Sequence, residues 1–206
     1  MRIGLDFDNT IVCYNDLFPR LAREKGLIAA GGVWTKNSLR DHLRKTDRED
    51  SWTELQGEAY GVSMGAAKPY AGSLEFIRFS RSRRAEVYVV SHKTKYPFSG
   101  PKTDLHRAAD DWIEALGFYD PAAGLARDNV FFELTKEEKL GRIGTLRCDF
   151  FVDDLPEFLE EADFPSGVQR ILFDPADSHG DSTEFKKVRS WNELRGVIFA
   201  LEQECG

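Results

Sequence analysis

The segment LDFDNT, residues 5–10, decides how the rest of the chain is interpreted, because it joins a strand-like run to two carboxylates. Residues 3–7 form a short, mostly apolar run that is typical of a buried strand. Asp6 and Asp8 lie at the end of that run, and Asn9 and Thr10 are residues that suit a turn. Two acids at a buried strand end repel each other unless a cation neutralises them, and oxygen ligands favour Mg²⁺. The segment therefore predicts a strand that ends in a metal site.

Similar apolar runs recur along the chain and alternate with helical patterns. Runs of this length that are rich in β-branched and aromatic residues suit a parallel sheet covered on both faces. The alternation predicts an α/β fold with a doubly wound parallel sheet. The further strands are expected at residues 87–90, 130–132, 150–152 and 171–173, and the helices at residues 74–79, 104–116, 136–146 and 191–201.

One stretch interrupts this alternation. Residues 14–68 contain three helical patterns, at 16–25, 35–45 and 50–60, but no good strand. We interpret the stretch as a small helical cap inserted after the first strand. The expected division is a catalytic core of residues 1–13 and 69–206 with a cap of residues 14–68.

Polar residues at the ends of two other strands should join Asp6. Asp153 and Asp154 follow the run at 150–152, and Ser91 ends the run at 87–90. The carboxyl ends of parallel strands meet at one edge of the sheet, which is where ligands bind in such folds. Four acids in one cleft, beside a hydroxyl that can contact a phosphate oxygen, indicate a metal and phosphate site.

A lysine near the start of one helix can supply a positive charge to the same edge. Thr135 can cap this helix, and Glu138 can complete a capping box three residues later. Lys136 then lies in the first turn, and Lys139 lies about one turn deeper. Either lysine could neutralise the nucleophile or the transferred phosphoryl group. Both lysines are candidates for this role.

Composition excludes several classes of protein. The chain has 206 residues, enough for one domain with a modest accessory lobe. Its formal net charge of −7 argues against binding a nucleic-acid backbone or an anionic membrane surface. Cys13, Cys148 and Cys205 lack the spacing of a zinc or redox motif, and no apolar run approaches the ~18 residues of a membrane span. We expect a cytoplasmic protein without a leader peptide, and the sequence leaves its oligomeric state open.

Taken together, these residues resemble the four motifs of the haloacid dehalogenase (HAD) superfamily, in the order of that family. Residues 6–10 resemble its DxDxT first motif, Ser91 its second, Lys136 or Lys139 its third, and the acidic pair at 153–154 its fourth. We favour Lys136, because the lysine of that family usually lies near this helix start, and keep Lys139 as the alternative. The insertion lies where that family carries a small type-one (C1) helical cap. The resemblance spans roughly residues 1–160 and implies a Rossmann-like core with phosphatase activity.

The resemblance also implies a role for each matching residue. Asp6 would attack phosphorus, while Asp8 would protonate the leaving oxygen and then activate water. Family members that dehalogenate lack an aspartate at the position of Asp8, so phosphoryl transfer is favoured. Mg²⁺ would be held by the Asp6 carboxylate, the Asp8 backbone carbonyl and Asp153, with Asp154 acting through water or pairing the lysine. The expected phosphate contacts are Thr10, Ser91 and His92.

The function expected from the sequence is thus a magnesium-dependent phosphatase of a small phosphorylated metabolite, with neither a nucleic acid nor a membrane as partner. Two alternatives share the fold. One is a non-catalytic domain that binds a phosphorylated ligand. The other is a nucleotide or nucleic-acid 3′-end phosphatase, and a nucleic-acid substrate would require a basic channel.

Two segments are candidates for selecting the substrate. The loop at residues 92–102 combines lysines with Tyr96 and Phe98, and it follows the carboxyl end of a strand. This composition is equally consistent with a plain surface loop. In the insertion, Trp52, Gln56 and Tyr60 fall on one helical face. That spacing favours a stripe in the core of the cap over a substrate contact.

Overall fold

The computed structural model describes residues 1–200, which form two compact units. The first unit consists of Met1–Ile11, Pro69–His92 and the chain from Gly117 onward. The second consists of Val12–Lys68 and Lys93–Leu116. Each unit has its own core, and each is described separately below.

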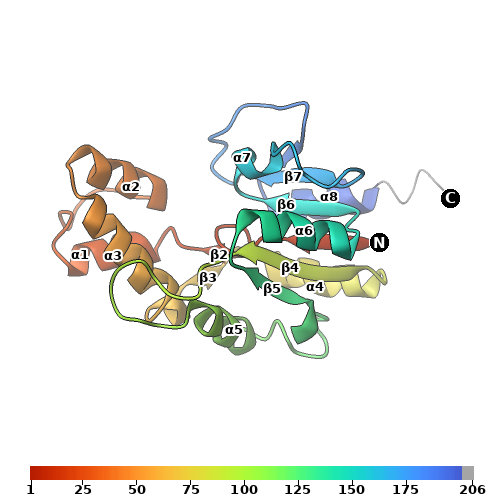
Figure 1. Cartoon of the computed structure of the whole chain (residues 1–206), viewed down its shortest axis with the longest axis horizontal. Coiled ribbons are helices and arrows are strands. Elements are labelled where there is room, and N and C mark those ends of the chain that lie inside the picture. The colour runs from red at the N-terminus through yellow and green to blue at the C-terminus, as the bar shows by residue number, and fades with distance from the viewer. Residues whose placement is uncertain (201–206) are drawn as a thin grey trace. The chain divides into compact units, whose positions relative to one another are not determined.

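A six-stranded parallel sheet forms the centre of the first unit, in the order β5-β4-β1-β6-β7-β8 (Figure 1). All five strands expected from the apolar runs are present, which confirms the doubly wound α/β prediction. The sixth strand was not expected, because its sequence KKV is short and only Val188 is buried. The strands are β1 (Arg2–Leu5), β4 (Glu86–His92), β5 (Val130–Glu133), β6 (Phe150–Asp153), β7 (Gln169–Phe173) and β8 (Lys186–Val188).

Helices cover both faces of this sheet (Figure 1). On one face, α4 (Ser73–Ser82) packs against α8 (Trp191–Ala200), with the ring centroids of Phe76 and Trp191 5.2 Å apart. On the other face lie α6 (Lys136–Leu146) and α7 (Pro156–Leu159), where Ile143 and Phe158 share a buried cluster with Phe151 of β6. A short 3-10 helix, η2 (Arg127–Asn129), precedes β5. The expected final residue of the last helix, 201, lies outside the described residues, as does Cys205.

The second unit is helical. Its elements are α1 (Leu17–Glu24), α2 (Lys36–Lys45), α3 (Glu49–Tyr60), the 3-10 helix η1 (Met64–Ala66) and α5 (Leu105–Ala115). The rings of Phe18 and Trp52 stack with centroids 4.9 Å apart, and both side chains are buried. Trp52 is therefore a core residue of this unit, as its helical spacing predicts. A two-stranded ladder of β2 (Val12–Cys13) and β3 (Lys68–Pro69) pairs the segments through which the chain enters and leaves the insertion.

The division into units differs from the expected one over residues 93–116. A helix is present near the expected position, but α5 packs with η1 and α3 of the second unit. The indole Nε1 of Trp112 donates to the carbonyl of Ala67 at 2.9 Å, and Ala109 and Ile113 are buried on the same side. Strand and helix alternation alone assigned this helix to the core, because the pattern does not reveal which apolar surface an amphipathic helix covers.

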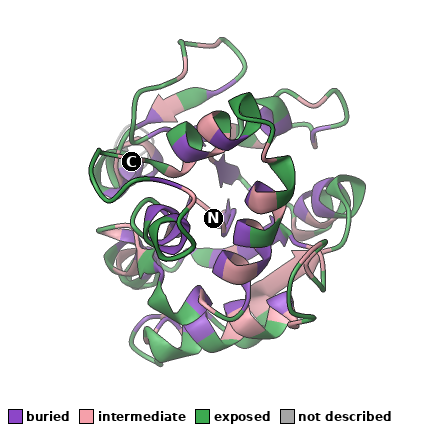
Figure 2. Ribbon diagram, turned by 90° about the vertical axis from the view of Figure 1, so that its left-hand side faces the viewer, coloured by how far each residue is buried: buried purple, intermediate pink, exposed green. Residues whose placement is uncertain are grey.

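In both units, the buried residues of the helices recur with the spacing of one helical face. Figure 2 shows helices that carry buried residues along one side and exposed residues along the other. This is the pattern of amphipathic helices packed on a core. Among residues 1–200, no helix combines the length and the apolar character that crossing a bilayer requires.

Candidate active site

Three neighbouring strands of the first unit bring the predicted carboxylates together. β1 lies between β4 and β6, with Leu5 level with Val89 on one side and with Val152 on the other. The Asp6 backbone N–H donates to the Val152 carbonyl at 2.8 Å, so the ladder extends to Asp6 itself. The chain then turns, because Asn9 adopts a left-handed conformation with φ 59°. The turn that the sequence predicts after the strand is present.

The carboxylate of Asp6 is held at one oxygen by two donors. The Ser91 hydroxyl at the end of β4 donates to Asp6 Oδ1 at 2.8 Å. The Lys139 ammonium on α6 donates to the same oxygen at 2.7 Å. Asp6 is only 5% exposed, so these donors hold a buried carboxylate in one orientation.

Lys139, and not the favoured Lys136, lies in this site. Its ammonium also contacts Asp153 Oδ2 at 2.6 Å, and its residue is 3% exposed. Lys136 is instead paired with Glu161 at the surface, at 2.5 Å. The predicted capping box of Thr135 is present, so the start of the helix is where the sequence places it. Lys139 lies about one turn deeper than Lys136, and its ammonium faces Asp6.

The charges of this cluster are coupled. Burial and the charge of Asp6 together raise the pKa of Asp153 to about 7, against the lowering effect of the Lys139 ammonium. Burial alone would lower the pKa of Lys139, but the charges of Asp153 and Asp6 raise it above the usual value. The lysine is thus held in its charged form, while one positive charge is shared between two buried carboxylates. A further cation would stabilise the ionised form of Asp153.

The side chains around this point fit a hard divalent cation. Asp6, Asp153 and Asp154 each place one carboxylate oxygen within 4.8 Å of the others. Carboxylate oxygens are the ligands that Mg²⁺ favours. Asp153 is also oriented by the backbone N–H of Leu155, which donates to its Oδ1 at 3.0 Å. The donor set therefore fits Mg²⁺, with these three aspartates as the residues that would hold it.

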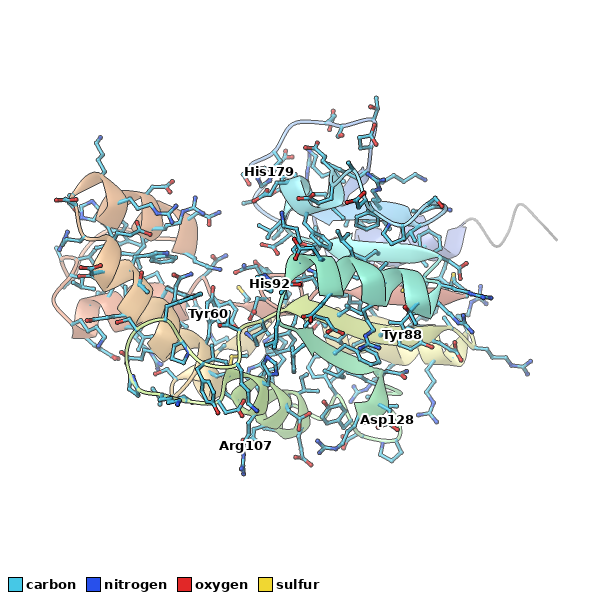
Figure 3. The ribbon with its side chains drawn as sticks, viewed as in Figure 1. Tyr60, Tyr88, His92, Arg107, Asp128 and His179 are labelled. Carbon is cyan, nitrogen blue, oxygen red and sulfur yellow. The ribbon has the colours of Figure 1, made fainter. Side chains whose placement is uncertain are left out.

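The remaining predicted residues lie at or near the same edge. Asp8 is half-buried beyond the end of β1, and it does not belong to the group of three carboxylates. Thr10 is fully buried, and its hydroxyl has no hydrogen-bond partner among residues 1–200. His92 is exposed, and its Nε2 lies 3.1 Å from the Leu134 carbonyl, so its ring faces the neighbouring loop. Figure 3 shows His92 at the same end of the sheet as His179.

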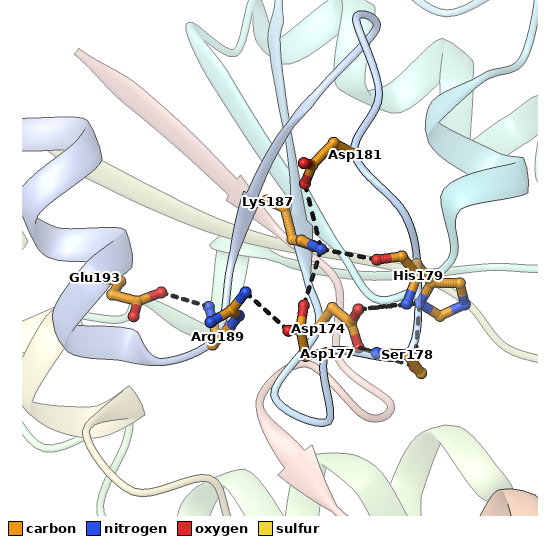
Figure 4. Close-up of polar contacts among 8 residues, drawn as sticks. All are labelled: Asp174, Asp177, Ser178, His179, Asp181, Lys187, Arg189 and Glu193. Carbon is orange, nitrogen blue, oxygen red and sulfur yellow. Dashed lines mark hydrogen bonds and ion pairs between the residues drawn. The ribbon is translucent and has the colours of Figure 1, made fainter.

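A third buried aspartate at this edge has no place in the predicted site. Asp174 follows β7 and is 3% exposed. It accepts from the backbone N–H of His179 at 2.8 Å, and from the N–H and hydroxyl of Ser178 at 3.1 and 3.0 Å (Figure 4). Burial opposes ionisation of Asp174, but these donors hold its pKa below the usual value. Lys187 donates to the His179 carbonyl at 2.7 Å and pairs with Asp177 at 2.9 Å. This carboxylate is therefore satisfied by its own loop.

Comparison with known proteins places this fold in a recognised class. No family model matches the sequence. A Bacillus cereus protein described as "Putative nucleotidase" is 22% identical over 205 residues, which covers 96% of this chain and 98% of that protein. A HAD family hydrolase from Deinococcus radiodurans, with bound phosphate and sodium, is similar in structure with a TM-score of 0.58 at 12% identity, covering 98% of this chain and 96% of that one.

A second solved structure leads to the same class. YfnB from Bacillus subtilis, described as a HAD-hydrolase and bound to magnesium, matches with a TM-score of 0.57 at 12% identity. The match covers 96% of this chain and 98% of that one. The chain therefore has the fold of the HAD-superfamily hydrolases.

Proposed function

We propose that this chain is a magnesium-dependent phosphomonoester hydrolase that acts through an aspartyl-phosphate on Asp6. The observation that carries the proposal is the orientation of the Asp6 carboxylate. Ser91 and Lys139 both donate to Oδ1, and they are the only hydrogen-bond partners of this side chain among residues 1–200. Oδ2 therefore remains available to attack phosphorus. The shared fold and the description of the Bacillus cereus relative support hydrolysis of a phosphate ester.

The first step forms the phosphoenzyme. Asp6 Oδ2 forms a bond to phosphorus while the bond from phosphorus to the leaving oxygen breaks. Asp8 donates a proton to that oxygen, so the product leaves as an alcohol. The two donors on Oδ1 hold the nucleophile in position. Because its orientation is already fixed, less entropy is lost on reaching the transition state.

The second step releases phosphate. Asp8, now ionised, accepts a proton from a water molecule as the water oxygen attacks phosphorus. The bond between phosphorus and Asp6 breaks, which restores both carboxylates to their starting states. The Ser91 hydroxyl already donates to Asp6, so Thr10, whose hydroxyl has no partner among residues 1–200, is the proposed phosphate contact at this edge.

The negative charge on the phosphoryl group requires compensation in both steps. Mg²⁺ held by Asp6, Asp153 and Asp154 would neutralise part of this charge. Lys139 contributes a second positive charge that the fold already holds beside Asp6. Lys136 has no part in this scheme, because its ammonium lies against Glu161.

The mechanism predicts a covalent intermediate that can be trapped. With Mg²⁺, the purified chain should release phosphate from p-nitrophenyl phosphate or from a member of a phosphometabolite panel. Asp6→Asn should lower the rate by at least about 10³-fold, because it removes the nucleophile. Acid quenching followed by mass spectrometry should find one phosphoryl group on Asp6. Asp16→Asn, at an exposed carboxylate of the second unit, is the matched control.

Full activity of Asp6→Asn, once a contaminating phosphatase is excluded, would overturn the mechanism. The non-catalytic alternative predicts a different result, in which a phosphorylated ligand raises the melting temperature without turnover across the panel. A nucleic-acid 3′-end phosphatase would bind oligonucleotides with a strong dependence on salt.

Nucleoside monophosphates are the first substrate class to test. The support is the description of the Bacillus cereus relative, which covers nearly the whole of both chains. Nucleoside monophosphates should be compared with sugar phosphates and phosphorylated small acids at equal concentration. A preference for either of the other two classes would leave the chemistry intact and replace the substrate.

A further inference from the structure

The second unit contains a pocket of its own. It has a volume of about 150 Å³ and lies between α3 and the loop that precedes α5, which run side by side in Figure 1. Residues of both segments line it, among them Gln56, Tyr60, Thr94, Pro97 and Phe98. Pockets that enclose a whole small molecule usually measure about 300–1,000 Å³. This pocket can therefore take one ring or a similar fragment of a ligand, but not a complete metabolite.

One wall of the pocket is a preorganised aromatic ring. Tyr60 makes edge contacts with Tyr14 and Phe18, at centroid distances of 5.0 and 5.7 Å. The ammonium of Lys93 lies 4.9 Å from the centroid of the same ring, and Lys93 is 4% exposed. Figure 3 shows Tyr60 on its helix in the second unit. A ring held in this way can receive another ring by offset or edge stacking with little loss of conformational entropy.

The rim of the pocket has an apolar side chain that the protein leaves uncovered. Phe98 is 90% exposed, although it lines the pocket. The loop that carries it approaches α3 closely, because Gly57 has no side chain. A Cβ at Gly57 would lie 2.3 Å from the Ser99 carbonyl oxygen and 3.0 Å from Pro97 Cβ. The loop is thus packed against the helix while Phe98 remains free to cover a ligand.

Three polar groups in this mostly apolar pocket lack protein partners. Among residues 1–200, the side-chain amide of Gln56 and the hydroxyls of Tyr60 and Thr94 make no hydrogen bond. An amide offers a donor and an acceptor side by side, which is how Gln and Asn recognise the edge of a heterocycle. A few convergent polar groups among apolar walls are typical of a ligand site.

The lining also limits the ligand by charge. Among residues 1–200 no carboxylate lines the pocket, and the Lys93 ammonium lies over the Tyr60 ring. A cationic ligand would find no counter-ion here. A sugar would leave most of its hydroxyls without partners, since each unmade hydrogen bond in a buried site is unfavourable. A flat, neutral ring with polar groups along one edge satisfies both the walls and the amide.

We propose that this pocket binds a planar heteroaromatic ring, such as a nucleobase. Resting on the proposed function, the ring belongs to the leaving group of the substrate. In the sequence, Thr94 follows Ser91 by only three residues. Neither the fold nor the four motifs assigns this pocket a ligand.

Binding of nucleosides, which carry no phosphate, tests the pocket without catalysis. Adenosine, guanosine, cytidine and uridine are titrated into the full chain by calorimetry, with ribose as the ring-free control. At least one nucleoside should bind saturably and ribose should not. Phe98→Ala should weaken that binding by about tenfold through loss of stacking, and Gln56→Leu by about fivefold through loss of the edge contacts.

Matched variants exclude a general effect on folding. Phe98 is nearly fully exposed, so Phe98→Ala should leave the melting temperature unchanged. Tyr96→Ala alters a half-exposed ring of the same loop that does not line the pocket, and it should bind nucleosides like the wild type. The proposal is overturned if no nucleoside binds saturably, or if Phe98→Ala and Gln56→Leu bind as well as the wild type.

Nucleoside binding can be measured whether or not the chain is a phosphatase. Asp6→Asn should bind nucleosides normally, because Asp6 does not line the pocket. In turnover, Phe98→Ala should raise KM for a nucleoside monophosphate, whereas Tyr96→Ala should not. Nucleoside binding without any turnover would retain the pocket and reject the phosphatase. Turnover without nucleoside binding would do the reverse.

Discussion

Two aspartates at the ends of neighbouring parallel strands show how differently the same residue can be used. Asp153 ends β6 and Asp174 follows β7, and both are almost completely buried. Burial opposes ionisation in both cases, yet the pKa of Asp153 is raised to about 7 while that of Asp174 is lowered. Burial therefore does not explain the difference, which must come from the groups that surround each carboxylate.

The surroundings differ in the kind of charge they present. Asp174 receives donors from its own loop that satisfy both of its oxygens, and the His179 ring lies 3.3 Å from Oδ2 (Figure 4). Asp153 shares one lysine with Asp6 and lies beside Asp154. A carboxylate whose oxygens are all hydrogen-bonded within the protein has a structural role. A group of carboxylates with too few neighbouring positive charges is suited to binding a cation.

The largest expected contrast concerns activity. Asp153→Asn should lower turnover by about 10²- to 10³-fold, because it removes a proposed ligand of the charge-neutralising metal. Asp174→Asn should stay within a few-fold of the wild type. Phosphate release at saturating Mg²⁺ measures both, and Mg²⁺ should raise the melting temperature of Asp174→Asn but not of Asp153→Asn. Equal losses in the two variants would remove the distinction between the aspartates.

The second contrast concerns the two lysines of α6. Lys139→Met should lower the free energy of unfolding by about 3–5 kcal/mol, because it leaves buried carboxylates without their positive partner. Lys136→Met breaks an ion pair at the surface, so it should change the free energy of unfolding much less. Urea unfolding in the presence of chelator measures both. When the measurement is repeated with Mg²⁺ in place of chelator, Lys139→Met should regain more stability than Lys136→Met. The opposite order would contradict the assignment of Lys139 to the site.

A smaller effect is expected for the loop carboxylate. Asp174→Asn replaces one carboxylate oxygen with an NH2 group. The side chain can then no longer accept hydrogen bonds from all three donors. The free energy of unfolding should fall by about 1–3 kcal/mol. Asp177→Asn, at a more exposed carboxylate of the same loop, is the control and should lose less. A loss no greater than that of the control would show that the donors add nothing.

The smallest effect is the pH dependence of the same loop. The pKa of Asp174 is lowered in the folded chain, so its contribution to stability is complete above the ordinary Asp value of about 4. It is lost as the pH falls through the lower folded value. The amide resonances of Ser178 and His179 should therefore move below pH 4 in NMR spectra. They should not titrate in that range in Asp174→Asn, and a transition at higher pH in the wild type would contradict the sign.

Much of the fold follows from local pattern. Five apolar runs became five strands of one sheet, because a strand buried on both faces needs an uninterrupted apolar sequence. The capping box at Thr135 placed the start of α6 correctly, because a cap is satisfied by residues three positions apart. β8 was not predicted, because an edge strand of three residues with one buried side chain has no apolar run to identify it.

The candidate site divides in the same way. The sequence alone determined that Asp6, Ser91 and Asp153 would meet, because strand ends in a parallel sheet share one edge whatever the details of packing. Only the tertiary structure decided that Lys139 faces Asp6, that α5 joins the second unit, and that Asp174 is already satisfied. Each of these depends on which surface or donor a side chain meets across the chain, and that is set by packing between segments far apart in sequence.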